Sequence, residues 1–131
     1  GHLDRVSITT AKAPAGLANA PYVVNSGLQL SQTAAQVLFE GSAVDAVKAF
    51  PSNVNVAAAL SLAGIGGERT RVTVVSDPSL TRTRHTIEAE GSSGRVSVQL
   101  ESSPNPLNPG SSYLSALSAI AHLRQLAAEV R

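Results

Sequence analysis

The chain has 131 residues, of which 43% are hydrophobic and 15% are charged, and its formal net charge is +1. These values predict one globular domain over residues 1–131 with a core of its own. They argue against a nucleic-acid-binding protein, which would carry a clustered basic excess, and against a membrane protein, which would carry a long apolar run. The sequence has no cysteine, which excludes disulfides, zinc–thiolate sites and a cysteine nucleophile. With no signal-peptide pattern either, we expect a cytoplasmic protein.

The first half of the sequence predicts two strands separated by a loop. Apolar and polar residues alternate over residues 3–10, which predicts a strand that begins almost with the chain. Because no capped helix or turn precedes this strand, we expect a further segment upstream. Residues 13–33 hold two prolines and two glycines and are predicted to be a loop with weak local structure. The apolar run 34–40, closed by Gly41, predicts a buried strand.

A short helix is predicted to follow. Ser42 and Asp45 have the spacing of a capping box, which predicts a helix that reaches about Phe50 and ends at Pro51. The glycines of Gly64-Ile65-Gly66-Gly67 lack the strand–loop–helix context of a phosphate-binding loop, so we interpret them as the end of a second helix.

This second helix, within residues 50–64, is apolar on nearly every side and should lie in the core or in a subunit interface. Asn53 or Ser52 is expected to be its N-cap. Asn55 falls in its first turn, where asparagine is a poor helix former. Free N–H groups and a partial positive charge at a helix N-terminus also favour polar ligand groups. The residues alone leave both an ordinary capping role and a ligand-binding role open for the two asparagines.

The second half predicts strands and a closing helix. Residues 69–76, 85–90 and 96–101 alternate in polarity and predict an antiparallel meander with one solvated face, with a hairpin turn at 91–94. Three prolines lead from there to a helix over about 111–130. Helices grouped apart from antiparallel strands favour an α+β fold, in which a mixed, largely antiparallel sheet carries helices on one face.

One of the three histidines, His85, lies where a loop enters a predicted strand. A histidine at such a position can act as a general acid or base. The alternative is an exposed histidine at a strand edge, and the residues alone favour this alternative. His122 lies in the closing helix and is interpreted as a surface or interface residue. No histidine has a partner at metal-ligand spacing, so no metal site is expected.

Taken together, these segments resemble the C-terminal domain of L-aspartate dehydrogenase. The resemblance follows the family's order over nearly the whole chain, except for residues 15–33. Its most specific part is Phe50-Pro51-Ser52-Asn53-Val54-Asn55-Val56-Ala57-Ala58. Supporting matches lie at residues 8–14, 38–43, 70–72, 76–78, 82–85, 87–91 and 104–112.

The resemblance implies an enzyme that oxidises L-aspartate to iminosuccinate with NAD or NADP, and that runs in reverse from oxaloacetate and ammonia. It also implies a role in NAD biosynthesis, a homodimer, and an N-terminal Rossmann domain, which this chain lacks. The chain is therefore expected to be a substrate-binding and dimerisation domain that is inactive alone. The alternative is a non-catalytic dimerisation or small-ligand-binding module with the same fold.

The resemblance also assigns roles to residues. His85 matches the family's catalytic histidine, although Thr83 stands where the family has asparagine. Asn55 matches the asparagine that contacts the nicotinamide cofactor, and Asn53 is its neighbour in the site. The resemblance does not by itself assign Asn53 a contact, but Asn53 is kept as a candidate for substrate binding. For the carboxylates of the substrate, the candidates from the chemistry of the residues are Arg82, Arg84 and the N–H groups of the helix N-terminus.

Overall fold

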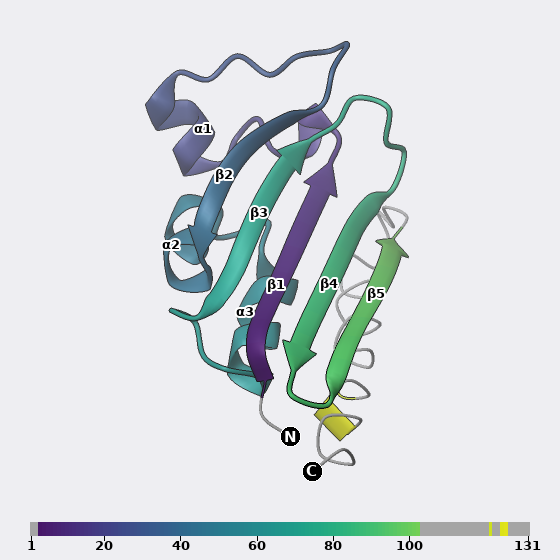
Figure 1. The fold of residues 1–131 in the computed structure, drawn as a ribbon. Coiled ribbons are helices and arrows are strands. Elements are labelled where there is room, and N and C mark those ends of the chain that lie inside the picture. The colour runs from purple at the N-terminus through teal and green to yellow at the C-terminus, as the bar shows by residue number, and fades with distance from the viewer. Residues whose placement is uncertain (1–2, 103–120, 122–123, 126–131) are drawn as a thin grey trace.

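The computed structural model describes residues 3–102, 121 and 124–125, and it confirms the α+β fold class. Five strands form one mixed sheet, and the helices lie on one face of it (Figure 1). The strands are β1 (Leu3–Lys12), β2 (Gln36–Ser42), β3 (Thr70–Ser76), β4 (Thr83–Gly91) and β5 (Gly94–Ser102). The helical elements are the 3₁₀ turn η1 (Pro14–Gly16), α1 (Pro21–Ser26), α2 (Ala43–Ala49) and α3 (Asn55–Ala63).

The strand order is β2-β3-β1-β4-β5. The predicted meander is wrong in one respect, because β1 is inserted between β3 and β4. β1 runs parallel to β3 and antiparallel to β4, and the other two neighbouring pairs are antiparallel. The predicted hairpin is present: Gly91 pairs with Gly94 across a two-residue turn. The central position of β1 matters because both of its neighbours contribute to the candidate site described below.

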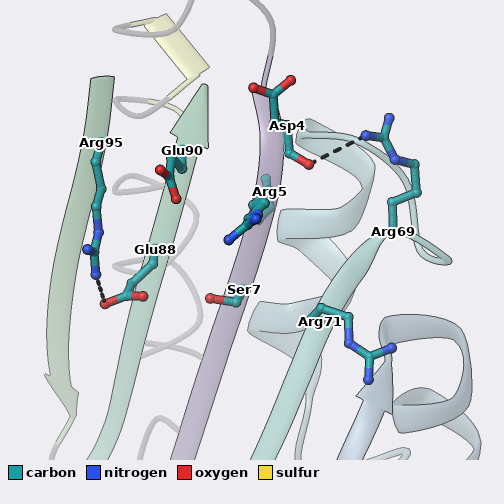
Figure 2. A pocket seen from close by; sticks show the side chains of 9 residues that line it. Asp4, Arg5, Ser7, Arg69, Arg71, Glu88, Glu90 and Arg95 are labelled. Carbon is teal, nitrogen blue, oxygen red and sulfur yellow. Dashed lines mark hydrogen bonds and ion pairs between the residues drawn. The ribbon is translucent and has the colours of Figure 1, made fainter. Parts of the chain in front are cut away.

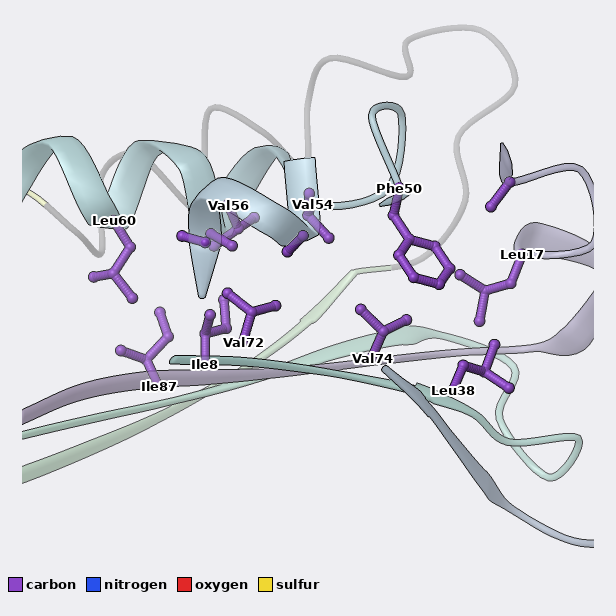
Figure 3. Packing of buried hydrophobic residues seen from close by; sticks show 14 of the residues in the cluster. Ile8, Leu17, Leu38, Phe50, Val54, Val56, Leu60, Val72, Val74 and Ile87 are labelled. Atoms are coloured by element: carbon purple, nitrogen blue, oxygen red, sulfur yellow. The ribbon is translucent and has the colours of Figure 1, made fainter. Parts of the chain in front are cut away.

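Alternation along the strands separates a covered face of the sheet from an open one. On β1 the even-numbered residues Val6, Ile8 and Thr10 are almost fully buried, and Ile8 pairs with Val72 and Ile87 on the neighbouring strands. We call this the inner face. Figure 3 shows α3 lying over it, with its apolar side chains pointing toward the sheet. The odd-numbered residues of β1 point to the opposite, outer face.

The predicted N-cap is present in α2 and absent in α3. The Ser42 hydroxyl accepts a hydrogen bond from the Asp45 N–H at 3.1 Å, so the predicted cap of α2 is confirmed. The predicted cap of α3 is wrong, because Val54 is the N-cap residue and provides no side-chain hydrogen bond. The α3 helix is held by burial of its apolar residues instead, among them Val56, Ala57 and Leu60.

The predicted loop over residues 13–33 is also partly wrong, since it contains η1 and α1. Pro21 is the first residue of α1, and Gly27 ends the helix in the left-handed conformation with φ 64°. Both are favoured residues at these positions. With only six residues, α1 has too few turns to form on its own. It is stabilised by packing, because the ring of Tyr22 lies 5.6 Å from that of Phe50.

Phe50 is the largest fully buried side chain of the core. Its ring also lies 6.0 Å from that of Phe39, so α1, β2 and the loop after α2 meet at one aromatic cluster. Burying a side chain of this size contributes about 2–3 kcal/mol to the free energy of unfolding.

The predicted closing helix over 111–130 lies outside the described residues, apart from positions 121, 124 and 125, which are helical. His122 also lies outside them. Within the part of the chain that the structure describes, no helix is both long enough and apolar enough to cross a membrane.

Candidate functional site

His85 lies on the inner face of β4, where it pairs with Thr10 of β1 and with Leu100 of β5. Only 7% of its surface is exposed. The interpretation of His85 as an exposed edge residue is therefore wrong, because β5 separates β4 from the edge of the sheet. A histidine enclosed in this way needs a polar partner for its ring.

Thr10 provides that partner. Its Oγ1 atom lies 2.9 Å from the Nδ1 atom of His85, and Thr10 itself is fully buried. This hydrogen bond fixes the plane of the imidazole and leaves Nε2 for another partner. Burial, together with the positive charge of Lys12, lowers the pKa of His85 from its usual 6.5 to about 4. The imidazole is therefore neutral at pH 7, which is the form that can accept a proton.

Two further polar residues lie at the same end of the inner face. Lys12 is the last residue of β1 and lies two positions after Thr10, so both share this face. Across the parallel pair, Lys12 is in register with Ser76, the last residue of β3. Figure 1 shows that β1 and β3 end together where β4 begins. The loop after β3 is tied to this end, since the N–H of Asp77 donates to the Lys12 carbonyl at 2.8 Å.

Asn55 is the first residue of α3 and its side chain is exposed. The other end of α3 lies over Val6, because a Cβ added to Gly64 would be 3.8 Å from the Val6 Cγ2 atom. Figure 1 shows α3 running in the direction opposite to β1. Asn55 lies about 14 Å back along the helix axis, which corresponds to about four strand residues. The first turn of α3 is therefore level with Thr10, at the His85 end of the sheet.

Asn53 has a structural contact that the sequence did not indicate. Its side-chain Nδ2 donates to the carbonyl of Gly16 at 2.9 Å, which links the loop before α3 to η1. Gly16 in turn lies against the aliphatic part of Lys12, whose Cβ and Cδ atoms are 3.9 Å from the position of an added Cβ. Asn53 thus supports the loop that borders Lys12.

The two arginines are not brought together with His85 on one face. Arg84 precedes His85 on β4 and faces the outer side, where its Nε lies 3.4 Å from Glu101 Oε1. This contact is an ion pair without hydrogen-bond geometry. Arg82 lies in the loop before β4 and is exposed.

A separate hollow of about 370 Å³ lies on the outer face, away from His85 and Asn55. Figure 2 shows its charged side chains, which come from β1, β3, β4, β5 and the residue before β3. Several of them already have partners. Arg95 donates to Glu88 at 3.0 Å, and Arg69 donates to the Asp4 carbonyl at 3.5 Å. The mixed and internally paired charges give this hollow no preference for one class of ligand.

Among the described residues, no three histidine, aspartate or glutamate side chains gather as they would around a metal ion. The candidate site consists of four residues at one end of the inner face, namely Thr10, Lys12, Ser76 and His85. They combine a neutral base, a cation and two hydroxyl groups.

Comparison with known proteins decides the family. The family described as "Aspartate dehydrogenase, C-terminal" matches residues 1–126. This chain belongs to the aspartate dehydrogenase C-terminal domain family. It is 54% identical to the L-aspartate dehydrogenase of Methanosarcina acetivorans over 95% of its length, and 44% identical to that of Nitrosopumilus maritimus over 94%. It spans 46% of each of these relatives, which is less than half of their length.

A solved structure agrees with this assignment. The crystal structure of aspartate dehydrogenase from Thermotoga maritima matches 95% of this aspartate dehydrogenase domain with a TM-score of 0.62 and 30% sequence identity. The match covers 45% of that protein. The family resemblance stated from the sequence is thus confirmed, together with the fold.

Sequence reasoning about this domain missed Thr10, Lys12 and Ser76 as members of the site. The pattern held a usable signal, because Thr10 and Lys12 continue the buried alternation of Val6 and Ile8 with polar residues. Polar residues on a buried face need partners or a function. Ser76 carried the same signal, since it continues the buried alternation of Val72 and Val74 on β3.

Proposed function

We propose that this chain is the substrate-binding domain of an NAD(P)-dependent L-aspartate dehydrogenase and that His85 is its catalytic base. The main support is the buried His85, which is neutral at pH 7 and is held through Nδ1 by Thr10. A base that accepts a proton from the substrate amine or from the attacking water must be neutral and must present a free nitrogen. Because the chain belongs to the aspartate dehydrogenase family, we propose that this base acts in the oxidation of aspartate.

The residues at the start of α3 fit a nicotinamide cofactor. Among the described residues no hydrogen bond engages the exposed amide of Asn55, which can donate to and accept from the carboxamide of the cofactor. When bound, the nicotinamide supplies the acceptor for the hydride that leaves the aspartate α-carbon. Asn55 would orient the ring, and His85 would take up the proton as the imine forms or is hydrolysed. We propose that the rest of the cofactor binds a Rossmann domain, consistent with this chain spanning less than half of the length of its relatives.

We further propose that the protein is a homodimer and works in the cytoplasm. The outer face is not covered by the described helices and exposes apolar side chains such as Val37, which pairs with Val75 on that face. A sheet face of this kind is suited to packing against a second copy. Arg82 and Arg84 remain proposed substrate contacts with weaker support, because Arg84 faces away from His85.

The test is the activity of a full-length protein that carries this domain. We expect it to produce NADH or NADPH from L-aspartate, and we expect His85→Ala to lower kcat by about 10²–10⁴-fold without unfolding the protein. Thr86→Ala, which changes the neighbouring residue on the outer face, is the control and should retain activity. Near-normal kcat in the His85 variant would remove His85 from catalysis. The 131-residue chain alone should show no turnover, and aspartate-dependent NADH formation by it would contradict its proposed dependence on a second domain.

A further inference from the structure

Lys12 has no ion-pair partner among the residues that the structure describes. It is partly buried at the end of β1. Burial lowers the pKa of Lys12 because the ammonium group is poorly solvated there. A partly buried cation without a carboxylate is unfavourable in the free protein and suits a site that receives an anion.

Ser76 adds an independent observation. Its Oγ atom is fully buried and has no hydrogen-bond partner among the described residues. Buried hydroxyl groups without partners are rare, because each costs free energy relative to its hydrated state. Ser76 is in register with Lys12 on the neighbouring strand, so the unsatisfied hydroxyl and the unpaired ammonium belong to adjacent residues.

His85 lies in the same neighbourhood. The positive charge of Lys12 is one of the two causes that lower the pKa of His85, so the ammonium group acts on the imidazole across this space. Thr10 connects them, since it precedes Lys12 by two residues on β1 and contacts the His85 ring at 2.9 Å. An anion bound by Lys12 and Ser76 would therefore lie beside the proposed base.

We propose that Lys12 and Ser76 bind one carboxylate of the substrate and so place the substrate against His85. This inference rests on the proposed function. A carboxylate accepts hydrogen bonds from both an ammonium and a hydroxyl group, and a charge-assisted hydrogen bond is about twice as strong as a neutral one. A bound carboxylate would compensate the charge of Lys12 and would also accept a hydrogen bond from Ser76. A neutral ligand would leave the charge of Lys12 uncompensated.

The test uses the 131-residue chain and succinate, a dicarboxylate without the reactive amine. Succinate binding is followed by NMR through the ring resonances of His85. We expect succinate to shift these resonances saturably and to raise the pKa of His85, because the bound carboxylate compensates the charge of Lys12. Lys12→Met should weaken succinate binding by at least about tenfold. Ser76→Ala should weaken it by about threefold to tenfold without lowering the Tm, because this variant removes an unsatisfied buried hydroxyl.

Lys48→Met is the matched control, because Lys48 is exposed in the last turn of α2 and its replacement removes the same charge. This variant should bind succinate as the wild type does. The proposal is overturned if succinate leaves His85 unchanged, if Lys12→Met binds it normally, or if inorganic phosphate or sodium chloride at equal ionic strength reproduces the effect. None of these outcomes bears on aspartate turnover by the full-length protein, so the dehydrogenase function is tested separately.

Discussion

At the scale of single residues, the site depends on which nitrogen of His85 carries the proton. A base that works through Nε2 must hold its proton on Nδ1, and the Nδ1–H group then donates to Thr10 Oγ1 over the observed 2.9 Å. Thr10 is therefore a positioning residue, because its hydroxyl accepts the Nδ1–H group of this tautomer and holds the plane of the ring. Since both residues are buried, loss of the hydroxyl would leave the ring nitrogen without a partner.

Replacing Thr10 with valine tests this role, because valine keeps the shape and removes only the hydroxyl. We expect kcat of the full-length protein to fall by about tenfold and KM for aspartate to change little. The free energy of unfolding should fall by about 1–3 kcal/mol. In ¹⁵N NMR spectra the neutral ring of His85 should become a mixture of tautomers. Thr9→Val, on the outer face of the same strand, is the control, and equal effects of the two substitutions would refute the positioning role.

At the scale of elements, the site is assembled by the ends of strands and by loops tied to them. Asn53 is the clearest link, because it joins the loop before α3 to η1, and η1 borders Lys12. The sequence made Asn53 a candidate for substrate binding, and in the structure its side-chain amide donates to the Gly16 carbonyl. Asn53 thus supports the wall of the site.

Asn53→Ala should loosen this wall while leaving the sheet intact. We expect the free energy of unfolding to fall by about 0.5–1 kcal/mol, because one exposed hydrogen bond is lost. Hydrogen exchange should become faster at the amides of Gly16 in η1 and of Leu17, which caps it, and should stay unchanged in β1. Asn25→Ala, on the exposed surface of α1, serves as the control. Unchanged exchange in η1 of the Asn53 variant would show that this bond does not hold the turn.

The sequence predicted those features that depend on local contacts and missed those that depend on long-range contacts. The cap at Ser42 and the turn at 91–94 depend on residues a few positions apart, so local rules predicted both. The α1 helix is held by packing of Tyr22 on Phe50, which local propensity does not contain. The contact between Thr10 and His85 joins residues 75 positions apart, and it depends on the insertion of β1 between β3 and β4. Only the family resemblance pointed to His85 before the strand order was known.

At the scale of the whole molecule, the two faces of the sheet differ in the polar groups that they carry. The inner face combines the apolar core with a polar end that holds a buried histidine and an unpaired lysine. The outer face carries two ion pairs among its described residues, Arg84–Glu101 and Arg95–Glu88, and faces away from the described helices. The unsatisfied polar groups at one end of the covered face lower the stability of the protein there.

That arrangement makes the stability of the chain depend on pH. The pKa of His85 is about 4 in the folded state and about 6.5 in the unfolded state, so the unfolded chain binds more protons between these values. Stability therefore rises with pH across this window and is fully present above it. Acidification from pH 7 to pH 4 should lower the free energy of unfolding by up to about 3 kcal/mol through this group alone. Urea denaturation at a series of pH values measures the effect, and His85→Gln isolates it from the titration of carboxylates. The wild type should lose more stability than the variant between pH 6.5 and 4, and parallel curves would show that His85 is not buried in its neutral form.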